Sequence, residues 1–274
     1  MTQSGPAGAS RRKGAVQPAM EQEPTVGHAT RPMRRRGQAR AALILDATEG
    51  LLAERSAADI SLADIAAASG VPLPSVYHFF PNRNAAFEAL ALRFNEEIYR
   101  RSIEVLTDPE PHTWQELLDR KHRRAAEFQN GRPAALRLFL GAGVSVAVRN
   151  ADLTGNARIA LSRARMFEAY FQIPPIPGFV TSLEIAAAAM DGIWALSYGR
   201  HGCITEHYRQ EATAATIAYL RRFLPEFLPR RPLEPAMLAR IAVSPSEVSL
   251  SITGSQGGAT ELTASNTRAT PTST

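Results

Sequence analysis

Two short helical patterns meet at a glycine within residues 61–83, and this stretch says more about function than the rest of the chain. Ser61 is a good N-cap residue, and apolar side chains follow it at helical spacing. Gly70 can adopt the left-handed conformation that ends a helix sharply. A second helix can begin at Pro72–Pro74, because proline is tolerated in a first helical turn. The stretch therefore predicts two helices joined by a tight turn.

The second helix has one apolar face and one outward face. Val71 and Val76 are expected to point back at Ile65 of the first helix. The side chains left for other contacts are Leu73, Ser75, Tyr77 and His78. This pattern is typical of a helix-turn-helix whose second helix enters the major groove of DNA, although an ordinary helical hairpin has the same local pattern.

The flanking segments favour the helix-turn-helix. Upstream, residues 39–54 form an amphipathic helix with a single apolar stripe, Leu43, Ile44, Ala47, Leu51 and Leu52. Downstream, Asn82 can cap a long helix predicted over 83–106. A three-helix unit of this size is about the smallest that buries a helix-turn-helix core.

Residues 40–94, about a fifth of the chain, resemble the DNA-binding region of the tetracycline-repressor (TetR) family of bacterial regulators. The matching residues are Leu45, Ala47, Asp64-Ile65-Ala66, Gly70-Val71, Ser75-Val76-Tyr77-His78, Phe80 and Arg83. The chain departs from the family at Pro72-Leu73-Pro74, where small polar and basic residues are usual. It departs again at Arg83-Asn84, where a lysine and an acidic residue are usual.

The resemblance implies a set of DNA-contacting residues: Arg40, Ser61, Pro72, Leu73, Pro74, Ser75, Tyr77, His78 and Arg83. Tyr77 is expected to contact a phosphate or sugar, and Arg83 a phosphate. Leu73, Ser75 and His78 are expected nearer the base edges. The proline-rich start leaves few hydrogen-bond donors for reading bases.

The basic charge of the chain is concentrated before this unit. Residues 1–40 contain eight arginine or lysine residues and two glutamates, whereas the whole chain has a net charge of +5. Residues 1–36 are predicted to be a basic disordered arm that follows the DNA backbone or minor groove. The alternatives are a solvated tail, or an overlong start with Met20 or Met33 as the natural first residue.

The remaining chain reads as an all-α protein. After the helix-turn-helix domain at 37–83, helices are predicted over 83–106, 113–130, 133–148, 152–172, 181–198 and 205–224. Gly141 and Gly143 are interpreted as packing glycines inside one of these helices. Residues 84–228 form the predicted bundle, and 229–274 lose periodicity and are expected to be a disordered tail.

The resemblance implies that the bundle binds an effector and dimerises. Family members usually pair through their last two long helices, here within residues 181–224. The alanine-rich stretch 183–190 allows close helix approach, either across a two-fold axis or inside one subunit. An apolar small-molecule effector is expected in a cavity lined by large side chains with a polar orienter, drawn from His122, Arg137, Phe139, Met166, Phe167, Tyr170 and Trp194. Core packing is the alternative explanation for each of them.

No pattern in the sequence favours catalysis or a cofactor. His201, Cys203 and His207 lie close together, but their spacing matches no metal motif. A single cysteine fits a cytoplasmic protein, and no apolar run is long enough to predict a membrane span.

The sequence thus predicts a cytoplasmic, homodimeric TetR-like regulator that binds double-stranded operator DNA. Its expected role is that of a repressor released by a small molecule, through a change in the spacing of two recognition helices. The alternatives are an activator, an effector-independent repressor, or a helical ligand carrier with a vestigial DNA-binding unit.

Overall fold

The computed structural model describes residues 30–141 and 145–248, and their regular elements are all helical. The chain divides between Ala39 and Arg40 into two compact units, and the fold described here is that of the second unit. The helices are α1 (Thr30–Glu54), a 3₁₀ turn η1 (Ala57–Asp59), α2 (Leu62–Ser69), α3 (Leu73–Phe79), α4 (Arg83–Ser102), α5 (Trp114–Asn130), α6 (Pro133–Phe139), α7 (Val146–Tyr170), α8 (Phe179–His201), α9 (Glu206–Leu220) and α10 (Pro235–Ala239). The predicted all-α fold class is confirmed.

The turn between α2 and α3 has the predicted geometry. The Ser61 hydroxyl accepts a hydrogen bond from the Asp64 amide at 3.1 Å, and the Asp64 carboxylate accepts one from the Ser61 amide at 2.8 Å. This capping box fixes the start of α2. Gly70 ends α2 with a φ of 65°, a conformation that strains any residue with a side chain. Val71 and Val76 are buried with Ile65 in one core, as predicted.

That core does not stop at the three-helix unit. It continues into α4 through Phe87, Leu90 and Phe94, and into α6 through Leu138 and Phe139. The helix-turn-helix is therefore packed onto the bundle through the first half of α4.

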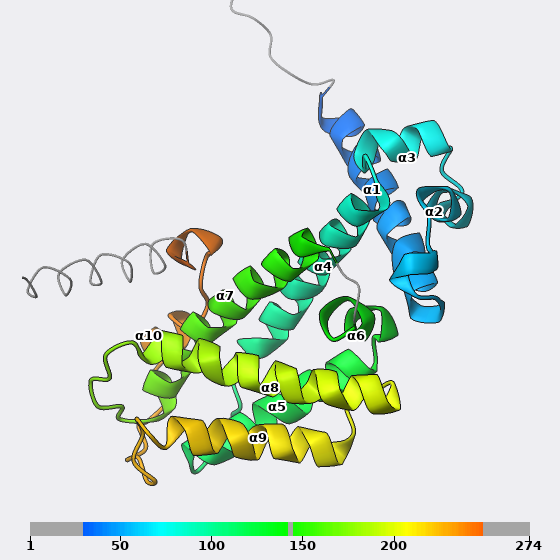
Figure 1. Ribbon diagram of the computed structural model, residues 1–274. Helices are drawn as coiled ribbons and strands as arrows, with labels where there is room; N and C mark the ends of the chain where they lie inside the picture. The colour runs from blue at the N-terminus through cyan, green and yellow to red at the C-terminus, as the bar shows by residue number, and fades with distance from the viewer. Residues whose placement is uncertain (1–29, 142–144, 249–274) are drawn as a thin grey trace, which may run out of the picture. The chain divides into compact units, whose positions relative to one another are not determined.

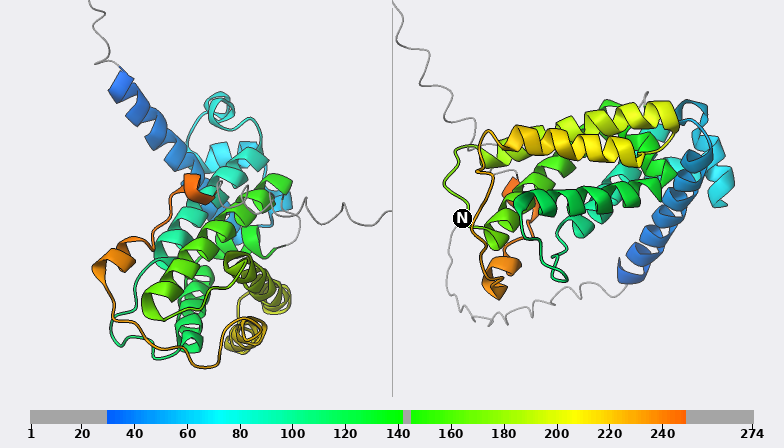
Figure 2. Two further views of the ribbon diagram at one scale, coloured as in Figure 1. Left: turned by 90° about the vertical axis from the view of Figure 1, so that its left-hand side faces the viewer. Right: turned by 90° about the horizontal axis from the view of Figure 1, so that it is seen from below.

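The bundle is built around two helix pairs. Helices α4 and α7 pack along each other, and α8 packs on both α7 and α9 (Figure 1). Figure 2 shows α8 and α9 lying side by side along one face of the bundle. A second core, which includes Trp114, Phe167 and Phe171, joins α5, α7, α8 and α9.

Two predicted helix boundaries are wrong. Residues 133–148 do not form one helix, because α6 ends at Phe139 and α7 begins at Val146, capped by the Ser145 hydroxyl. Gly141 lies at this break rather than inside a helix, and a Cβ atom there would collide with the Arg137 carbonyl oxygen. Gly143 lies outside the described residues.

The predicted disordered termini also need correction. Residues 30–36 belong to α1, a continuation that arginine, a good helix former, favours. Residues 229–248 pack against the bundle, with Ile241 and Val243 buried. Tyr99 of α4 holds this segment by donating a hydrogen bond to the Val243 carbonyl at 3.1 Å. The rest of the predicted arm and tail, 1–29 and 249–274, lies outside the described residues.

Candidate DNA-binding surface and ligand cavity

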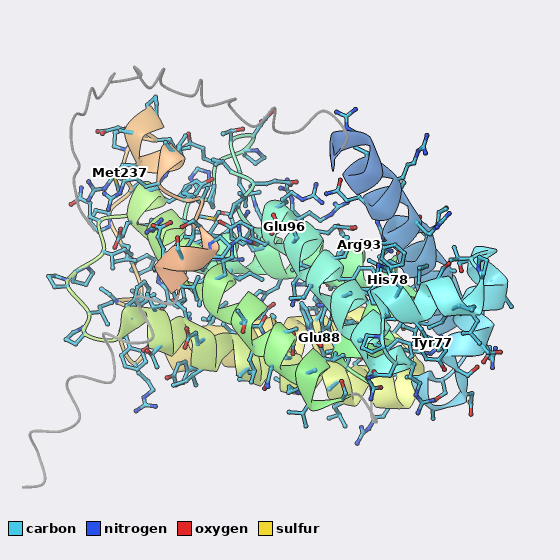
Figure 3. The ribbon with its side chains drawn as sticks, turned by 90° about the horizontal axis from the view of Figure 1, so that it is seen from above. Tyr77, His78, Glu88, Arg93, Glu96 and Met237 are labelled. Atoms are coloured by element: carbon cyan, nitrogen blue, oxygen red, sulfur yellow. The ribbon has the colours of Figure 1, made fainter. Side chains whose placement is uncertain are left out.

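The exposed face of α3 carries most of the side chains predicted to contact DNA. Val76 anchors the helix in the core, while Tyr77 is 53% exposed and His78 is also exposed (Figure 3). Pro72 and Pro74 are exposed, and Ser75 is half-buried. Leu73 differs from the rest, because it packs against the core and offers only part of its surface. The outward face of α3 is therefore mainly aromatic and imidazole, with few hydrogen-bond donors.

Three of the predicted DNA contacts belong to segments other than α3, and two of them have hydrogen-bond partners inside the protein. The Ser61 hydroxyl is engaged in the capping box. Arg83 Nη1 donates to the carbonyl oxygens of Ala58 at 2.8 Å and Ile60 at 3.0 Å. Arg40 is exposed and has no hydrogen bond or ion pair to another described residue. Arg83 thus fastens the end of the η1 turn to α4, a role that the sequence did not predict.

An ion-pair network ties α1 to the bundle. Arg93 of α4 contacts Asp46 at 2.6 Å and Glu49 at 2.5 Å (Figure 3). Arg132 also pairs with Glu49, at 2.9 Å, and with Glu97 at 3.1 Å. These contacts hold α1 against the middle of α4 and the start of α6.

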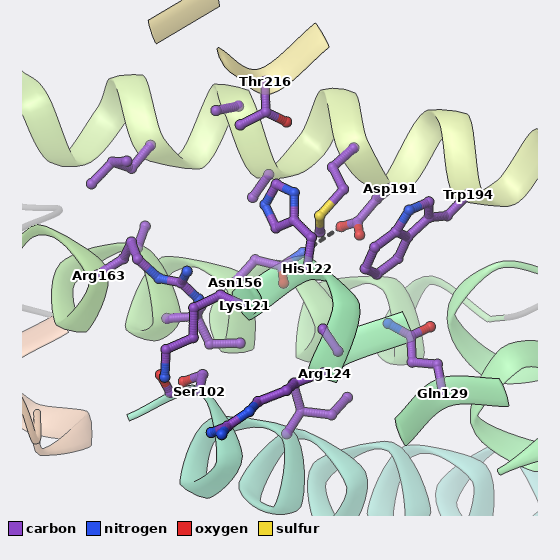
Figure 4. A pocket seen from close by; sticks show the side chains of 18 of the residues that line it. Ser102, Lys121, His122, Arg124, Gln129, Asn156, Arg163, Asp191, Trp194 and Thr216 are labelled. Carbon is purple, nitrogen blue, oxygen red and sulfur yellow. Dashed lines mark hydrogen bonds between the residues drawn. The ribbon is translucent and has the colours of Figure 1, made fainter. Parts of the chain in front are cut away.

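A cavity of about 120 Å³ lies inside the bundle, walled by α4 to α9 (Figure 4). Of the seven predicted effector-binding residues, it is lined by His122, Phe139 and Trp194. His122 Nδ1 lies 3.0 Å from the Thr213 hydroxyl, and its ring meets Trp194 edge-on. Burial lowers the pKa of His122 to about 3, so the ring is neutral at physiological pH.

The other four predicted effector residues lie elsewhere. Arg137 donates to the Leu52 carbonyl at the end of α1 and does not line the cavity. Met166 and Phe167 fill the second core, with no exposed surface. The Tyr170 hydroxyl accepts a hydrogen bond from the Leu106 amide at 2.6 Å and donates one to the Leu106 carbonyl at 3.0 Å. The structure does not bring these four residues to the cavity, since Met166, Phe167 and Tyr170 are packed into the second core and Arg137 is bonded to α1.

The cavity is also lined by charged side chains that were not among the predicted effector residues. Figure 4 shows Arg163 and Lys121 on one side, and Asp191 with Trp194 on the other. Lys121 Nζ donates to the Ser102 carbonyl at 3.0 Å and to the Glu104 carbonyl. Burial and the nearby Arg163 charge lower the pKa of Lys121 to about 7.

Asp191 is the most strongly perturbed acid in the cavity. It accepts a hydrogen bond from the Asn156 side chain at 3.0 Å. Burial, together with the negative charge of Asp152, raises the pKa of Asp191 to about 7. Asp152 itself pairs with Arg149 at 3.0 Å.

Three buried polar atoms in the cavity wall have no hydrogen-bond partner among the described residues: Arg163 Nη1, Gln129 Oε1 and Trp194 Nε1. Unpaired buried polar atoms are rare in folded proteins, since each loses its hydration without compensation. Their concentration in one cavity distinguishes it from a packing defect, which would be apolar.

The missed residues had a signal in the sequence. Asp152, Asn156 and Arg163 fall four and seven residues apart on α7, on the side that also carries the buried Ala160. Polar side chains repeated on the buried face of a helix indicate a polar cavity. The predicted effector residues were instead mostly large apolar or aromatic side chains, which more often belong to a core.

The histidine and cysteine group near the end of α8 does not form a metal centre in the part of the chain that the structure describes. His201 and His207 each pack against the Tyr208 ring. Cys203 is half-buried with a free thiol.

Comparisons with known proteins agree with the fold and the helix-turn-helix. Residues 44–90 match the family model for bacterial regulatory proteins of the tetR family. A TetR-family transcriptional regulator from Streptomyces coelicolor has a similar fold, with a TM-score of 0.50 and 24% identity over 69% of this chain and 99% of that one. A TetR transcriptional regulator from Rhodococcus sp. RHA1 gives a TM-score of 0.51 and 20% identity, over 67% of this chain and 96% of that one. No curated protein sequence matches the chain. Residues 44–90 therefore form a DNA-binding helix-turn-helix of the TetR family, whose members are transcriptional regulators that act by binding DNA and not by catalysis, and the described chain shares the all-helical fold of such regulators.

Proposed function

We propose that this TetR-family regulator is a cytoplasmic, homodimeric repressor that a small molecule releases from its operator. The observation that carries the proposal is the double use of α4. Its first half, with Phe87, Leu90 and Phe94, is packed into the helix-turn-helix core. Its second half lines the cavity with Asn95, Ile98, Arg101 and Ser102. A ligand that shifts the second half of α4 therefore also shifts the first half of α4, against which the helix-turn-helix core is packed.

Such a ligand must bind the two conformations with different affinities. It weakens DNA binding only by the difference between its affinities for the two conformations. Coupling energies in allosteric proteins are typically about 1–3 kcal/mol, or about 5- to 150-fold in affinity. Helix α4 lines the cavity and also packs in the helix-turn-helix core that carries α3. This direct connection is enough for a coupling of this size.

The surface of α8 and α9 supports the dimer. Helix α8 is long and apolar enough by composition to cross a membrane, with a mean hydropathy of 1.4, yet only 22% of that window is buried. Its exposed face repeats small and apolar side chains at helical spacing: Thr181, Ile185, Ala188, Ala189, Gly192, Leu196 and Gly199. The exposed face of α9 adds Ala214, Ala215 and Ala218. A second copy of the same two helices would cover both faces in a four-helix contact.

The test is DNA binding by the full-length protein to the segment upstream of its own gene. Fluorescence anisotropy is expected to show sequence-selective binding that weakens steeply with salt. Deletion of the gene is expected to raise transcription from the bound promoter. Lowered transcription would show an activator, and absence of selective binding would favour a ligand carrier whose helix-turn-helix has lost its role.

A further inference from the structure

On the cationic side of the cavity, one arginine has no counter-charge among the described residues. Arg163 of α7 makes no hydrogen bond and no ion pair with any described residue, and its Nη1 atom is buried. Arg163 as a whole is half-buried. Burying a guanidinium nitrogen without a partner is costly, so folded proteins rarely do so without a use for it.

The nearby charged groups do not compensate Arg163. Lys121 is a second cation, close enough for the Arg163 charge to lower its pKa, and its bonds go to neutral carbonyl groups. The two carboxylates in the cavity wall have other partners, since Asp152 pairs with Arg149 and Asp191 accepts from Asn156. The Glu104 carboxylate lies 3.5 Å from Arg124. This side of the cavity therefore has positive charge and open donors.

The remainder of the cavity suits a short apolar body. Leu183, Ala186, Met190 and Phe139 contribute apolar wall, and Trp194 lines the same cavity with its Nε1 donor unpaired. An apolar protein cavity of about 150 Å³ holds benzene, so a volume of about 120 Å³ fits a ligand of roughly that size without large rearrangement.

We propose that the cavity binds a small organic acid whose carboxylate pairs with Arg163 and whose apolar body extends toward Trp194. A guanidinium and a carboxylate can form two parallel hydrogen bonds, which explains the choice of arginine at this position. This proposal rests on the proposed effector role of the cavity and names the chemical class of the effector. It differs from the apolar effector that the sequence suggested by the addition of a carboxylate.

The probes are matched pairs of nearly the same size and shape in which only the acid carries a charge: phenylacetate with phenylacetamide, and hexanoate with hexanamide. Calorimetric titration at pH 7.5 is expected to show each acid binding about 10- to 100-fold more tightly than its amide, because a charge-assisted bidentate contact is lost with the amide. The stronger binder should also raise the melting temperature, by linkage to the native state. Equal binding of acid and amide, or no stabilisation by either acid, would overturn the proposal.

Arg163→Met tests the residue itself. It is expected to reduce acid affinity to the level of the amide and, because an unpaired buried charge is removed, to raise the melting temperature of the free protein. A merely structural arginine would give a lower melting temperature instead. Arg163→Lys keeps the charge without the planar fork and is expected to bind the acids with intermediate affinity.

The matched control is Arg123→Met on α5, whose side chain is 55% exposed and pairs with Asp119 outside the cavity. This variant is expected to retain the acid-to-amide ratio of the native protein. If it loses the ratio as Arg163→Met does, the contact is general electrostatics and the proposal fails.

A DNA-release assay separates this proposal from the effector role. Acids that bind through Arg163 and release DNA support both. Acids that bind through Arg163 but leave DNA affinity unchanged support the ligand class and overturn the effector role. Release by the amides with no binding of the acids would keep the effector role and overturn the ligand class.

Discussion

Arg83 has a structural role within the protein and a predicted role at the DNA backbone, and experiment can separate the two. Its Nη1 atom bonds the Ala58 and Ile60 carbonyls, and a phosphate contact would use the other guanidinium nitrogens. Arg83→Ala is expected to destabilise the protein by about 1 kcal/mol and to make the salt dependence of DNA binding shallower by about two units per dimer. Urea unfolding and binding at several salt concentrations measure the two effects.

Arg40→Ala is the control for that prediction. Arg40 is exposed and lacks an internal partner among the described side chains, so its removal is expected to change the salt dependence and leave the unfolding free energy unaltered. An unchanged slope with Arg83→Ala would mean that Arg83 serves the fold alone.

Asp191 predicts a pH dependence of stability. Its folded pKa of about 7 lies above the unfolded value of 3.8, so its stabilising contribution is complete below about pH 4 and is lost as the pH rises toward 7. Asp152 strengthens this shift, whereas Asn156 and Arg149 oppose it. Thermal unfolding of Asp191→Asn between pH 4.5 and about 7 is expected to lack this loss.

The pH profile of Asp191→Asn must be compared with that of the native protein, because other groups also make the stability depend on pH. His122 faces the same cavity with a lowered pKa, and its contribution has the opposite sign, growing as the pH rises through about 3 to 6.5. Lys121 stays charged in both states over most of this range and adds little. Identical pH profiles for the native protein and Asp191→Asn would show that Asp191 titrates normally.

At the scale of whole elements, the segment after α9 holds α4 and α7 together. Tyr99 of α4 and Arg158 of α7 meet at the Val243 carbonyl, and the Arg158 guanidinium stacks 3.5 Å from the Tyr99 ring centroid. Tyr99→Phe removes the hydroxyl that accepts from the buried Val243 amide. We expect a loss of about 1–3 kcal/mol in unfolding free energy, measured with denaturant.

Tyr219→Phe provides the comparison, because the Tyr219 hydroxyl has no hydrogen bond to another described residue while its ring packs on Phe223. This variant is expected to unfold at nearly the native denaturant concentration. Equal losses in the two variants would show that the hydroxyl of Tyr99 has no special role.

The sequence predicted those elements whose ends carry strong local signals. Ser61, Gly70 and Asn82 set the limits of α2 and α4 as expected, because capping and left-handed turns depend on neighbouring residues. The break at Gly141 depends on a close approach to the Arg137 carbonyl, which a periodicity does not reveal. The docked segment 229–248 was missed because its few apolar residues bind a surface formed by distant helices.

The candidate site also has a part that the sequence predicted and a part that it did not. The exposed face of α3 was predicted because a helix-turn-helix has one fixed geometry. The cavity was only partly predicted, since whether Met166 or Met190 faces it depends on how six helices pack together. Arg163 shares the spacing of Asp152 and Asn156 on α7, but its lack of a partner depends on the side chains that the neighbouring helices bring to the cavity, which the sequence does not show.

For the whole molecule, DNA binding should depend on the contact between two copies. A dimer engages two half-sites, and bivalency typically raises affinity about 10²- to 10⁴-fold. Leu196→Glu places a charge on the exposed face of α8, where Leu196 is 48% exposed, and is expected to give monomers that bind the operator at least about 100-fold more weakly. Sedimentation analysis measures the mass.

Val146→Glu is the matched change outside α8 and α9, since Val146 is 76% exposed at the start of α7. It is expected to remain dimeric and to bind DNA normally. A dimeric Leu196→Glu protein would place the interface elsewhere.

The two tryptophans lie in environments different enough to make the protein its own optical reporter. Trp114 has its indole nitrogen bonded to the Pro225 carbonyl at 2.9 Å and does not line the cavity. Trp194 lines the cavity with its indole nitrogen unpaired. In a Trp114→Phe protein, the remaining emission is expected to shift in wavelength or intensity when the cavity fills, whereas the emission of Trp194→Phe should stay constant. Occupancy could then be followed in a stopped-flow instrument without any label, and its rate compared with the rate at which DNA departs.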